Sequence, residues 1–236
     1  MRQLLPQPAE QVDPASVYRR HRPPPAGRPW VVANMIASAD GAATVEGRSG
    51  GLGGPADRQV FQLLRASVDV VVAAAGTVRV ERYRPILEPR PIPIAVVSRS
   101  LTLDWSSPLF TEATARTILL TCEAADQAVR RRAGAVADVV VAGGEAVDPK
   151  LALAALAERG HQVALCEGGP DLLAQLVAVD VVDELCLTVS PMLVGGDGPR
   201  ILSGRVATTP PRLLLESVLE DDGFLLLRYL VQRAAR

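Results

Sequence analysis

The 236-residue chain has few of the residues from which several classes of site are built. Its two histidines and three cysteines fall in no spacing typical of a zinc site or a histidine-based catalytic triad. Cys122, Cys166 and Cys186 are odd in number and lie in apolar runs, which predicts buried, reduced thiols and a cytoplasmic protein. Only 3% of the residues are aromatic, so we expect aliphatic side chains and backbone to enclose any bound heterocycle.

The charge and the hydropathy pattern argue against two further classes. With 25 basic and 26 acidic residues, the formal net charge is −1, without the basic excess of a nucleic-acid-binding surface. No apolar run reaches the roughly 20 residues of a membrane-spanning helix, and the N-terminus lacks the apolar core of a secretory signal. We therefore expect a small-molecule ligand, and neither a nucleic acid nor a membrane as a partner.

From Trp30 onward, short apolar runs alternate with helical patterns. Strands are predicted at 30–38, 68–74, 92–98, 117–122, 136–142 and 162–166, and helices at 55–66, 123–133, 149–159 and 170–179. Continuous apolar strands separated by helices indicate an α/β fold with a mostly parallel central sheet covered by helices on both faces. Three more strands are predicted at 182–190, 212–220 and 224–232, and the sequence Asp221-Asp222-Gly223 predicts a C-terminal antiparallel hairpin.

The first 29 residues differ from the rest of the chain. They contain seven prolines and a basic cluster formed by Arg19, Arg20 and Arg22. We interpret residues 1–29 as an extended N-terminal arm whose basic cluster is exposed to solvent, and residues 30–236 as a single domain.

Glycine-containing turns follow two of the predicted strands. Gly168 and Gly169 precede a helix that begins at Pro170, where free N–H groups and the helix dipole suit a phosphate. A packing turn is the alternative, because neither G-x-G-x-x-G nor a P-loop motif is present. Thr77, in the turn 75–78, suits either a helix cap or a hydrogen bond to a ligand.

Two more strand ends carry candidate ligand groups. Ser98-Arg99-Ser100 places a guanidinium between two hydroxyls, which suits a phosphate monoester such as the 2′-phosphate of NADPH, although a solvated arginine explains it equally well. Asp40-Gly41 ends the first strand, and five glycines follow between residues 47 and 54. Because ligands bind at the carboxyl ends of parallel strands, these features predict one site at a shared edge of the sheet.

Three blocks of sequence resemble one known family. The block 34–41 is similar to the N-x-x-x-S-x-D-G opening of the reductase domain in bacterial riboflavin-biosynthesis deaminase-reductases. The block 57–65, followed by Gly76-Thr77-Val78, resembles the family's second motif. Glu167-Gly168-Gly169-Pro170, then Val182-Asp183-Glu184-Leu185, resembles its third. The blocks occur in order over residues 30 to 232.

The resemblance implies a dihydrofolate-reductase-like fold, NADPH as the cofactor and a homodimer. It also implies the reaction, which reduces the ribosyl group of 5-amino-6-(5-phosphoribosylamino)uracil to a ribityl chain. We expect hydride to reach C1′ of a ring-opened imine. Because residues 1–29 are too few for the zinc deaminase domain that often precedes this reductase, we expect a stand-alone reductase.

Residue roles follow from the same resemblance. The residues it assigns to the cofactor are Thr77, Glu81, Ser98, Arg99, Gly168, Gly169 and Pro170. Those it assigns to the substrate are Ser49, Arg65 and Glu167, with Arg65 suited to the 5′-phosphate. Asp40 is the first candidate for the catalytic proton donor and Glu167 the second, and a structural role in capping backbone is the alternative for both.

One departure from the family pattern keeps other functions open. Ala42 stands where many members place Lys or Arg after the Asp-Gly pair. The missing cation favours, as an alternative, a reductase of a different pteridine-like substrate such as dihydrofolate. A non-catalytic nucleotide-binding protein with the same fold is the third hypothesis.

Overall fold

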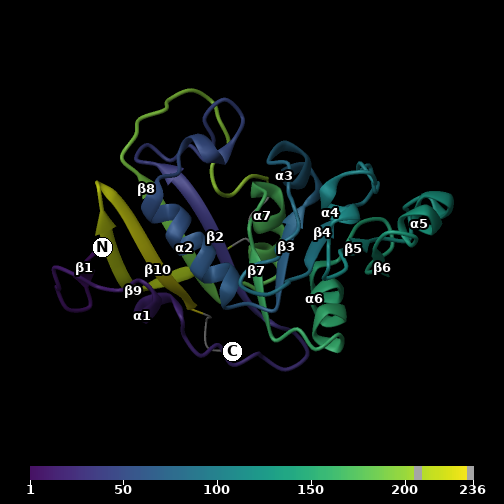
Figure 1. Cartoon of the computed structure of the whole chain (residues 1–236), viewed down its shortest axis with the longest axis horizontal. Helices are drawn as coiled ribbons and strands as arrows, with labels where there is room; N and C mark the ends of the chain where they lie inside the picture. Colours follow the sequence, from purple (N-terminus) through teal and green to yellow (C-terminus); the bar gives the residue numbers. More distant parts are fainter. Residues whose placement is uncertain (205–208, 233–236) are drawn as a thin grey trace.

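In the computed structural model, residues 1–204 and 209–232 are described, and within them one ten-stranded sheet runs in the order β1-β9-β10-β8-β2-β7-β3-β4-β5-β6 (Figure 1). The strands are β1 (Arg2–Leu5), β2 (Trp30–Ser38), β3 (Val70–Ala74), β4 (Ile94–Val97), β5 (Ile118–Thr121), β6 (Asp138–Val141), β7 (Val163–Cys166), β8 (Glu184–Ser190), β9 (Arg212–Asp221) and β10 (Phe224–Gln232). The helices are α1 (Ala15–Tyr18), α2 (Pro55–Ala66), α3 (Ala75–Val80), α4 (Pro108–Thr111), α5 (Gln127–Ala133), α6 (Pro149–Glu158) and α7 (Pro170–Ala178), with a 3-10 turn at Ser49–Gly51.

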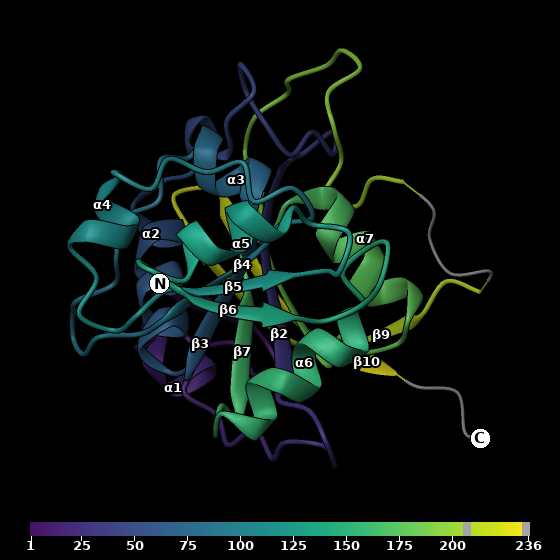
Figure 2. The ribbon, with the colours of Figure 1, turned by 90° about the vertical axis from the view of Figure 1, so that its right-hand side faces the viewer.

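The strands from β8 to β6 are parallel and are covered on both faces, as the apolar runs predict. Alternate residues of each strand point to opposite faces. Val32 packs with α1 to α5 on one face, whereas its neighbour Val31 packs with α6 and α7 on the other. Figure 2 shows α1, α2 and α4 on one side of the sheet and α6 and α7 on the opposite side.

The predicted C-terminal hairpin is confirmed. Asp221 pairs with Phe224, so β9 and β10 are joined by the two residues Asp222 and Gly223. Both residues have a positive φ, of 50° and 80°. A two-residue turn of this handedness matches the twist of the flanking strands, which explains the Asp-Gly pair.

Two helices differ from the sequence prediction. The segment 75–78, predicted as a glycine turn, is part of α3, because Gly76 does not adopt a positive φ and the chain passes directly from β3 into a helix. Helix α5 begins at Gln127 rather than at residue 123. The carboxylate of Asp126 accepts a hydrogen bond from the backbone N–H of Val129 at 2.9 Å, which fixes the start of the helix.

The N-terminal arm is anchored to the sheet. Strand β1 pairs antiparallel with β9, and α1 packs beside α2. Arg22 is buried and bonds Glu184 through two nitrogens, at 2.8 and 2.9 Å. Arg28 makes a similar pair with Asp183, at 2.6 and 2.8 Å. The predicted solvent exposure of the basic cluster is therefore wrong for Arg22, which is held by a buried carboxylate.

Glu184 is the centre of this buried network. Arg228 also bonds its carboxylate, at 2.8 Å. Burial acts to raise the pKa of Glu184, but the hydrogen bonds and charges of Arg22 and Arg228 outweigh it and hold the pKa below the ordinary value. The two acidic residues of the Val-Asp-Glu-Leu motif thus fix the arm to the beginning of β8.

The three cysteines are buried and unpaired with one another, as the sequence predicts. Burial raises the pKa of the Cys166 thiol to about 12. Within the described ranges, no helix combines the length and the apolar character needed to cross a membrane.

Loss of the buried pair should destabilise the fold. We predict that Arg22→Met lowers the free energy of unfolding by about 3 kcal/mol, because part of the charge of Glu184 is then uncompensated in the interior. Urea unfolding measures this change. Arg2→Met is the matched control, since Arg2 pairs with Glu220 at an exposed site and should change the free energy by less than about 1 kcal/mol. Equal effects of the two substitutions would contradict the prediction.

Candidate functional site

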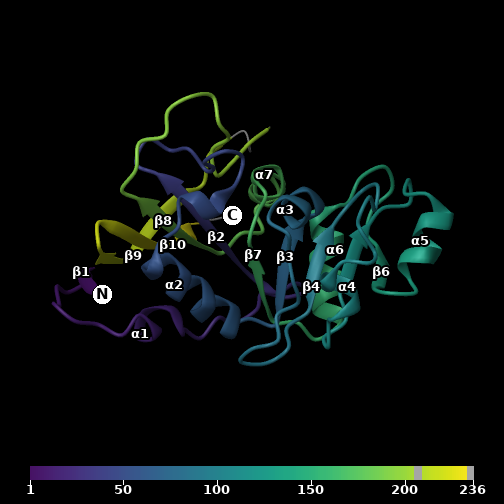
Figure 3. The same cartoon turned by 45° about the horizontal axis from the view of Figure 1, so that its top comes forward.

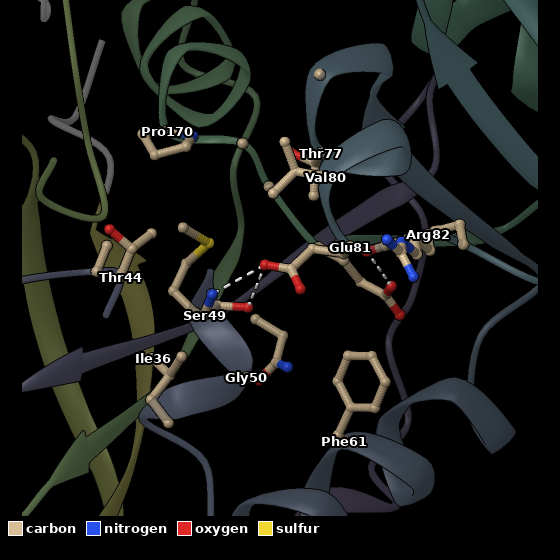
Figure 4. A pocket seen from close by; sticks show the side chains of 18 of the residues that line it. Ile36, Thr44, Ser49, Gly50, Phe61, Thr77, Val80, Glu81, Arg82 and Pro170 are labelled. Carbon is tan, nitrogen blue, oxygen red and sulfur yellow. Dashed lines mark hydrogen bonds between the residues drawn. The ribbon is translucent and has the colours of Figure 1, made fainter. Parts of the chain in front are cut away.

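A cavity of about 600 Å³ opens at the carboxyl edge of the sheet. Its walls come from the end of β2, one side of α2, the loop 47–50, α3 with the segment 81–85, and the β7–α7 turn. Figure 4 shows Ser49 and Gly50 on one side of the cavity, Thr77, Val80 and Glu81 on another, and Phe61 below them. Segments that are far apart in sequence therefore meet in one hollow.

Most of the residues singled out from the sequence line this cavity. Those that do are Ser49, Arg65, Thr77, Glu81, Glu167, Gly168, Gly169 and Pro170. Asp40, Ser98 and Arg99 follow parallel strands at the same edge but are not among the lining residues.

An ion pair crosses the cavity wall between α2 and β7. Arg65 bonds both oxygens of Glu167, each at 2.7 Å, and Glu167 is nearly inaccessible to solvent. The hydroxyl of Tyr83 donates a third hydrogen bond to Glu167 at 2.8 Å. The Arg65 guanidinium also lies 4.2 Å from the centre of the Phe61 ring, a cation–π distance. These contacts hold Arg65 in one orientation at the cavity surface.

The pKa shifts of Arg65 and Tyr83 favour a charged guanidinium and a neutral phenol. Burial acts to lower the pKa of Arg65, but the hydrogen bond and charge of Glu167 outweigh it and raise the pKa. Burial, together with the negative charge of Glu167, raises the pKa of Tyr83 well above its ordinary value. Tyr83 is therefore a hydrogen-bond donor that positions Glu167.

The glycine-rich loop, residues 47–54, is hydrogen-bonded through Ser49 to Glu81 at the end of α3. The carboxylate of Glu81 accepts hydrogen bonds from the backbone N–H and the hydroxyl of Ser49, at 2.8 and 3.0 Å (Figure 4). Gly54, which precedes α2, lies so close to Phe224 that a Cβ there would stand 2.7 Å from the ring. This close approach requires a glycine at the residue that precedes α2.

The β7–α7 turn fits the phosphate group of a dinucleotide. Gly168 has a φ of +99°, and a Cβ on Gly169 would stand 2.8 Å from the hydroxyl oxygen of Thr77. Pro170 opens α7, whose first N–H groups are directed out of the helix at its N-terminus. The backbone of Gly168 and Gly169 thus carries no side chain and lies next to the hydroxyl of Thr77 and the N-terminus of α7. This combination suits the binding of a phosphate.

Asp40 holds a loop rather than lining the cavity. Its carboxylate accepts hydrogen bonds from the hydroxyl of Ser38, from Val194 N–H at 3.2 Å and from Gly195 N–H at 2.7 Å. These bonds, that of Ser38 first, lower the pKa of Asp40 to about 2. The loop after β8 consequently runs beside the loop after β2 (Figures 1 and 3). At neutral pH Asp40 is a negatively charged carboxylate that anchors the backbone of the loop after β8.

Ser98 and Arg99 occupy the end of β4. The hydroxyl of Ser98 is buried and accepts a hydrogen bond from the N–H of Leu101 at 2.9 Å, so it caps a local turn. Arg99 is exposed, and its guanidinium lies 3.8 Å from the carboxylate of Glu145.

Several lining residues were missed from the sequence. They include Asp57, Arg58, Arg82, Tyr83 and Arg84. A signal existed for the first of these, because positions 57, 61 and 65 are four residues apart and so share one side of α2. No comparable periodicity marks the segment 82–84, which is irregular.

The parallel sheet and its antiparallel hairpin define the dihydrofolate-reductase-like class of α/β fold. Dihydrofolate reductase from Enterococcus faecalis has the same fold, with a TM-score of 0.52 and 14% identity over 86% of this chain and 97% of that one. A pyrimidine reductase-like protein from Corynebacterium diphtheriae is more similar, with a TM-score of 0.80 and 28% identity over 87% of this chain and 93% of that one.

Residues 29–226 match the model of the RibD C-terminal domain, and the chain belongs to this family. A curated relative in Archaeoglobus fulgidus is 30% identical over 193 residues, covering 75% of this chain and 87% of the relative. That relative is named 2,5-diamino-6-ribosylamino-4(3H)-pyrimidinone 5′-phosphate reductase. The family and fold expected from the sequence are confirmed, and so is the class of enzyme, an oxidoreductase.

The anchoring of the loop after β8 by Asp40 can be tested by hydrogen exchange. We predict that Asp40→Ala speeds hydrogen exchange at the amides of Val194 and Gly195, because both lose their acceptor. Exchange monitored by NMR measures this change. The amide of Val129, which bonds Asp126 in a separate cap, is the internal control and should keep its rate. Unchanged exchange at Val194 and Gly195 would contradict the anchoring role.

Proposed function

We propose that this protein uses NADPH to reduce a 5′-phosphorylated ribosylamino-pyrimidine to its ribitylamino product, a step in riboflavin biosynthesis. The observation that carries the proposal is the cavity itself. It is lined both by Arg65, which Glu167 holds in one orientation, and by the turn Gly168-Gly169, which has no side chains. An arginine suits the phosphate of the substrate, and the turn suits the phosphates of the cofactor. The name of the Archaeoglobus fulgidus relative supports the same class of substrate.

The residues that would hold NADPH are those of the glycine turn and α3. Thr77, Gly168, Gly169 and Pro170 would contact its phosphates, and Glu81 would keep the glycine-rich loop closed beside it through Ser49. When bound, the nicotinamide supplies the hydride. The Enterococcus faecalis relative in fold was solved with NADP(H). We assign Arg99, exposed at the end of β4, to the 2′-phosphate, with Ser98 capping the turn that carries it.

The charges of the cavity support a phosphorylated substrate. Four arginines line it, at positions 58, 65, 82 and 84, against three carboxylates, at 57, 81 and 167. Arg65 is oriented by Glu167 and remains partly exposed, so we assign it to the 5′-phosphate. Ala42 is buried and is not a lining residue, and the cations of this cavity come from α2 and the segment 82–84 instead.

We further propose that the enzyme works in the cytoplasm as a homodimer, as the family resemblance implies. Leu213 and Leu214 on β9 are both exposed, and as neighbours on a strand they point to opposite faces of the sheet, so one of the two could contribute apolar surface to such an interface. Reduced thiols suit this compartment.

A substrate comparison tests the function. Purified protein and NADPH are mixed separately with 5-amino-6-(5-phosphoribosylamino)uracil, with its non-deaminated 2,5-diamino pyrimidinone counterpart and with dihydrofolate, and the loss of absorbance of the reduced cofactor is followed. We expect turnover of a phosphoribosylamino-pyrimidine. Turnover of dihydrofolate alone would overturn the riboflavin assignment. Cofactor binding without turnover of any of the three would instead favour a non-catalytic nucleotide-binding protein.

The glycine turn provides a test of cofactor placement. We predict that Gly169→Ala weakens NADPH binding at least about tenfold, or about 1.4 kcal/mol, because its Cβ would collide with the hydroxyl of Thr77. Titration of NADPH fluorescence measures the affinity. Gly144→Ala is the control, since a Cβ there meets no atom within 4 Å and the position lies outside the cavity lining. An unchanged affinity in Gly169→Ala would remove the turn from the cofactor site.

A further inference from the structure

Hydride addition to an imine carbon also requires a proton for the adjacent nitrogen. Four ionisable groups of the cavity wall could carry that proton: Asp57, Glu81, Tyr83 and Glu167. A general acid must hold a proton that it can release, so its existing hydrogen bonds and charge neighbours decide among the four.

Three of the four groups are committed to other contacts. Glu167 accepts three hydrogen bonds from Arg65 and Tyr83, so both of its oxygens are already engaged as acceptors. The hydroxyl of Tyr83 donates a hydrogen bond to Glu167, and burial raises the pKa of Tyr83 well above the ordinary value. Glu81 accepts both hydrogen bonds of Ser49 and so acts as an acceptor for the loop.

Asp57 has a different environment. It lies half-buried in the first turn of α2, on the same side of the helix as Phe61 and Arg65, and it lines the cavity. A Cβ on Gly53 would stand 3.0 Å from one oxygen of its carboxylate, so the glycine-rich loop covers that oxygen closely. The hydroxyl of Thr188, on the buried strand β8, hydrogen-bonds the same carboxylate.

The groups around Asp57 leave burial as the dominant influence. Burial raises the pKa of Asp57, whereas the hydrogen bond from Thr188 and the positive charge of Arg58, on the same helix, act to lower it. From α1, Tyr18 interacts electrostatically with Asp57, and its own pKa is raised by burial, so it faces Asp57 as a neutral phenol. The net pKa of Asp57 lies above the ordinary value for an aspartate.

We propose that Asp57 is the catalytic proton donor of the reduction, an inference that rests on the proposed function. As hydride adds to the carbon of the substrate C=N bond, the π electron pair moves to nitrogen. The O–H bond of Asp57 breaks and an N–H bond forms, which leaves Asp57 as a carboxylate that regains its proton from solvent. The substrate gains two electrons and the nicotinamide loses two. Asp57 therefore takes the role that the sequence suggested for Asp40 or Glu167.

Kinetics of matched variants test the role in catalysis. We expect Asp57→Asn to lower kcat about 100-fold or more, the typical contribution of a general acid, while NADPH affinity stays within a few-fold. Thr188→Val removes a hydrogen bond that lowers the pKa of Asp57, so the basic limb of its kcat/KM profile should shift to higher pH. Asp104→Asn, an isosteric change in an exposed loop outside the cavity lining, is the control with wild-type kinetics.

Unfolding of the free protein provides a second readout that needs no substrate. Because its pKa is raised in the folded state, Asp57 makes wild-type stability fall as the pH rises above about 4, its unfolded pKa. Asparagine has no such dependence. The difference in Tm between Asp57→Asn and wild type should therefore increase in favour of the variant as the pH rises, and then level off.

The outcomes separate this inference from the proposed function. If Asp57→Asn has the same kcat and the same pH profile as the wild type, the inference is overturned and the proposed function stands. A Tm difference that is independent of pH would overturn the inference whatever the activity. If dihydrofolate proves to be the substrate, the same kinetics apply to its C=N bond, and only the riboflavin assignment fails. A wild-type chain that reduces none of the compounds overturns both.

Discussion

The arrangement of the site depends on one constraint, the need to neutralise Glu167 where it is buried at the end of β7. A carboxylate removed from water requires a hydrogen-bonded cation, and Arg65 of α2 supplies it through two bonds of 2.7 Å. The pair joins the helix that carries Asp57 to the strand that carries the glycine turn. It therefore fixes the distance between the proposed substrate wall and the proposed cofactor wall, which a hydride transfer requires to be constant.

The sequence predicted the central fold well because the apolar pattern is nearly free of exceptions there. The predicted strand at 30–38 has the bounds of β2, and the Asp-Gly turn of the hairpin depends on local backbone preference alone. The arm was predicted less well. Its structure depends on Arg22 meeting Glu184, 162 residues away, and no local pattern encodes such a contact.

The site was predicted in part for the same reason. Motif resemblance led to Arg65, Glu167 and the glycine turn, which do line one cavity. It did not distinguish which carboxylate is locked in place, because the partners of Glu167 and Asp40 come from distant segments. Asp57 was present in a quoted motif without a role, since its burial and its contact with Thr188 follow from how α2 packs on the sheet.

The short strand β1 has a consequence for how the protein behaves at high concentration. It covers the outer edge of β9, whose unpaired backbone groups would otherwise be a template for strands of other molecules. The outer edge of β1 is only four residues long, and Gln3 on it already pairs with Ala9 through two backbone hydrogen bonds of 2.8 and 3.0 Å. The strand also begins with the charged Arg2 and is followed by Pro6, features that disfavour further pairing. The N-terminal arm thus disfavours aggregation of the sheet through the edge at β9.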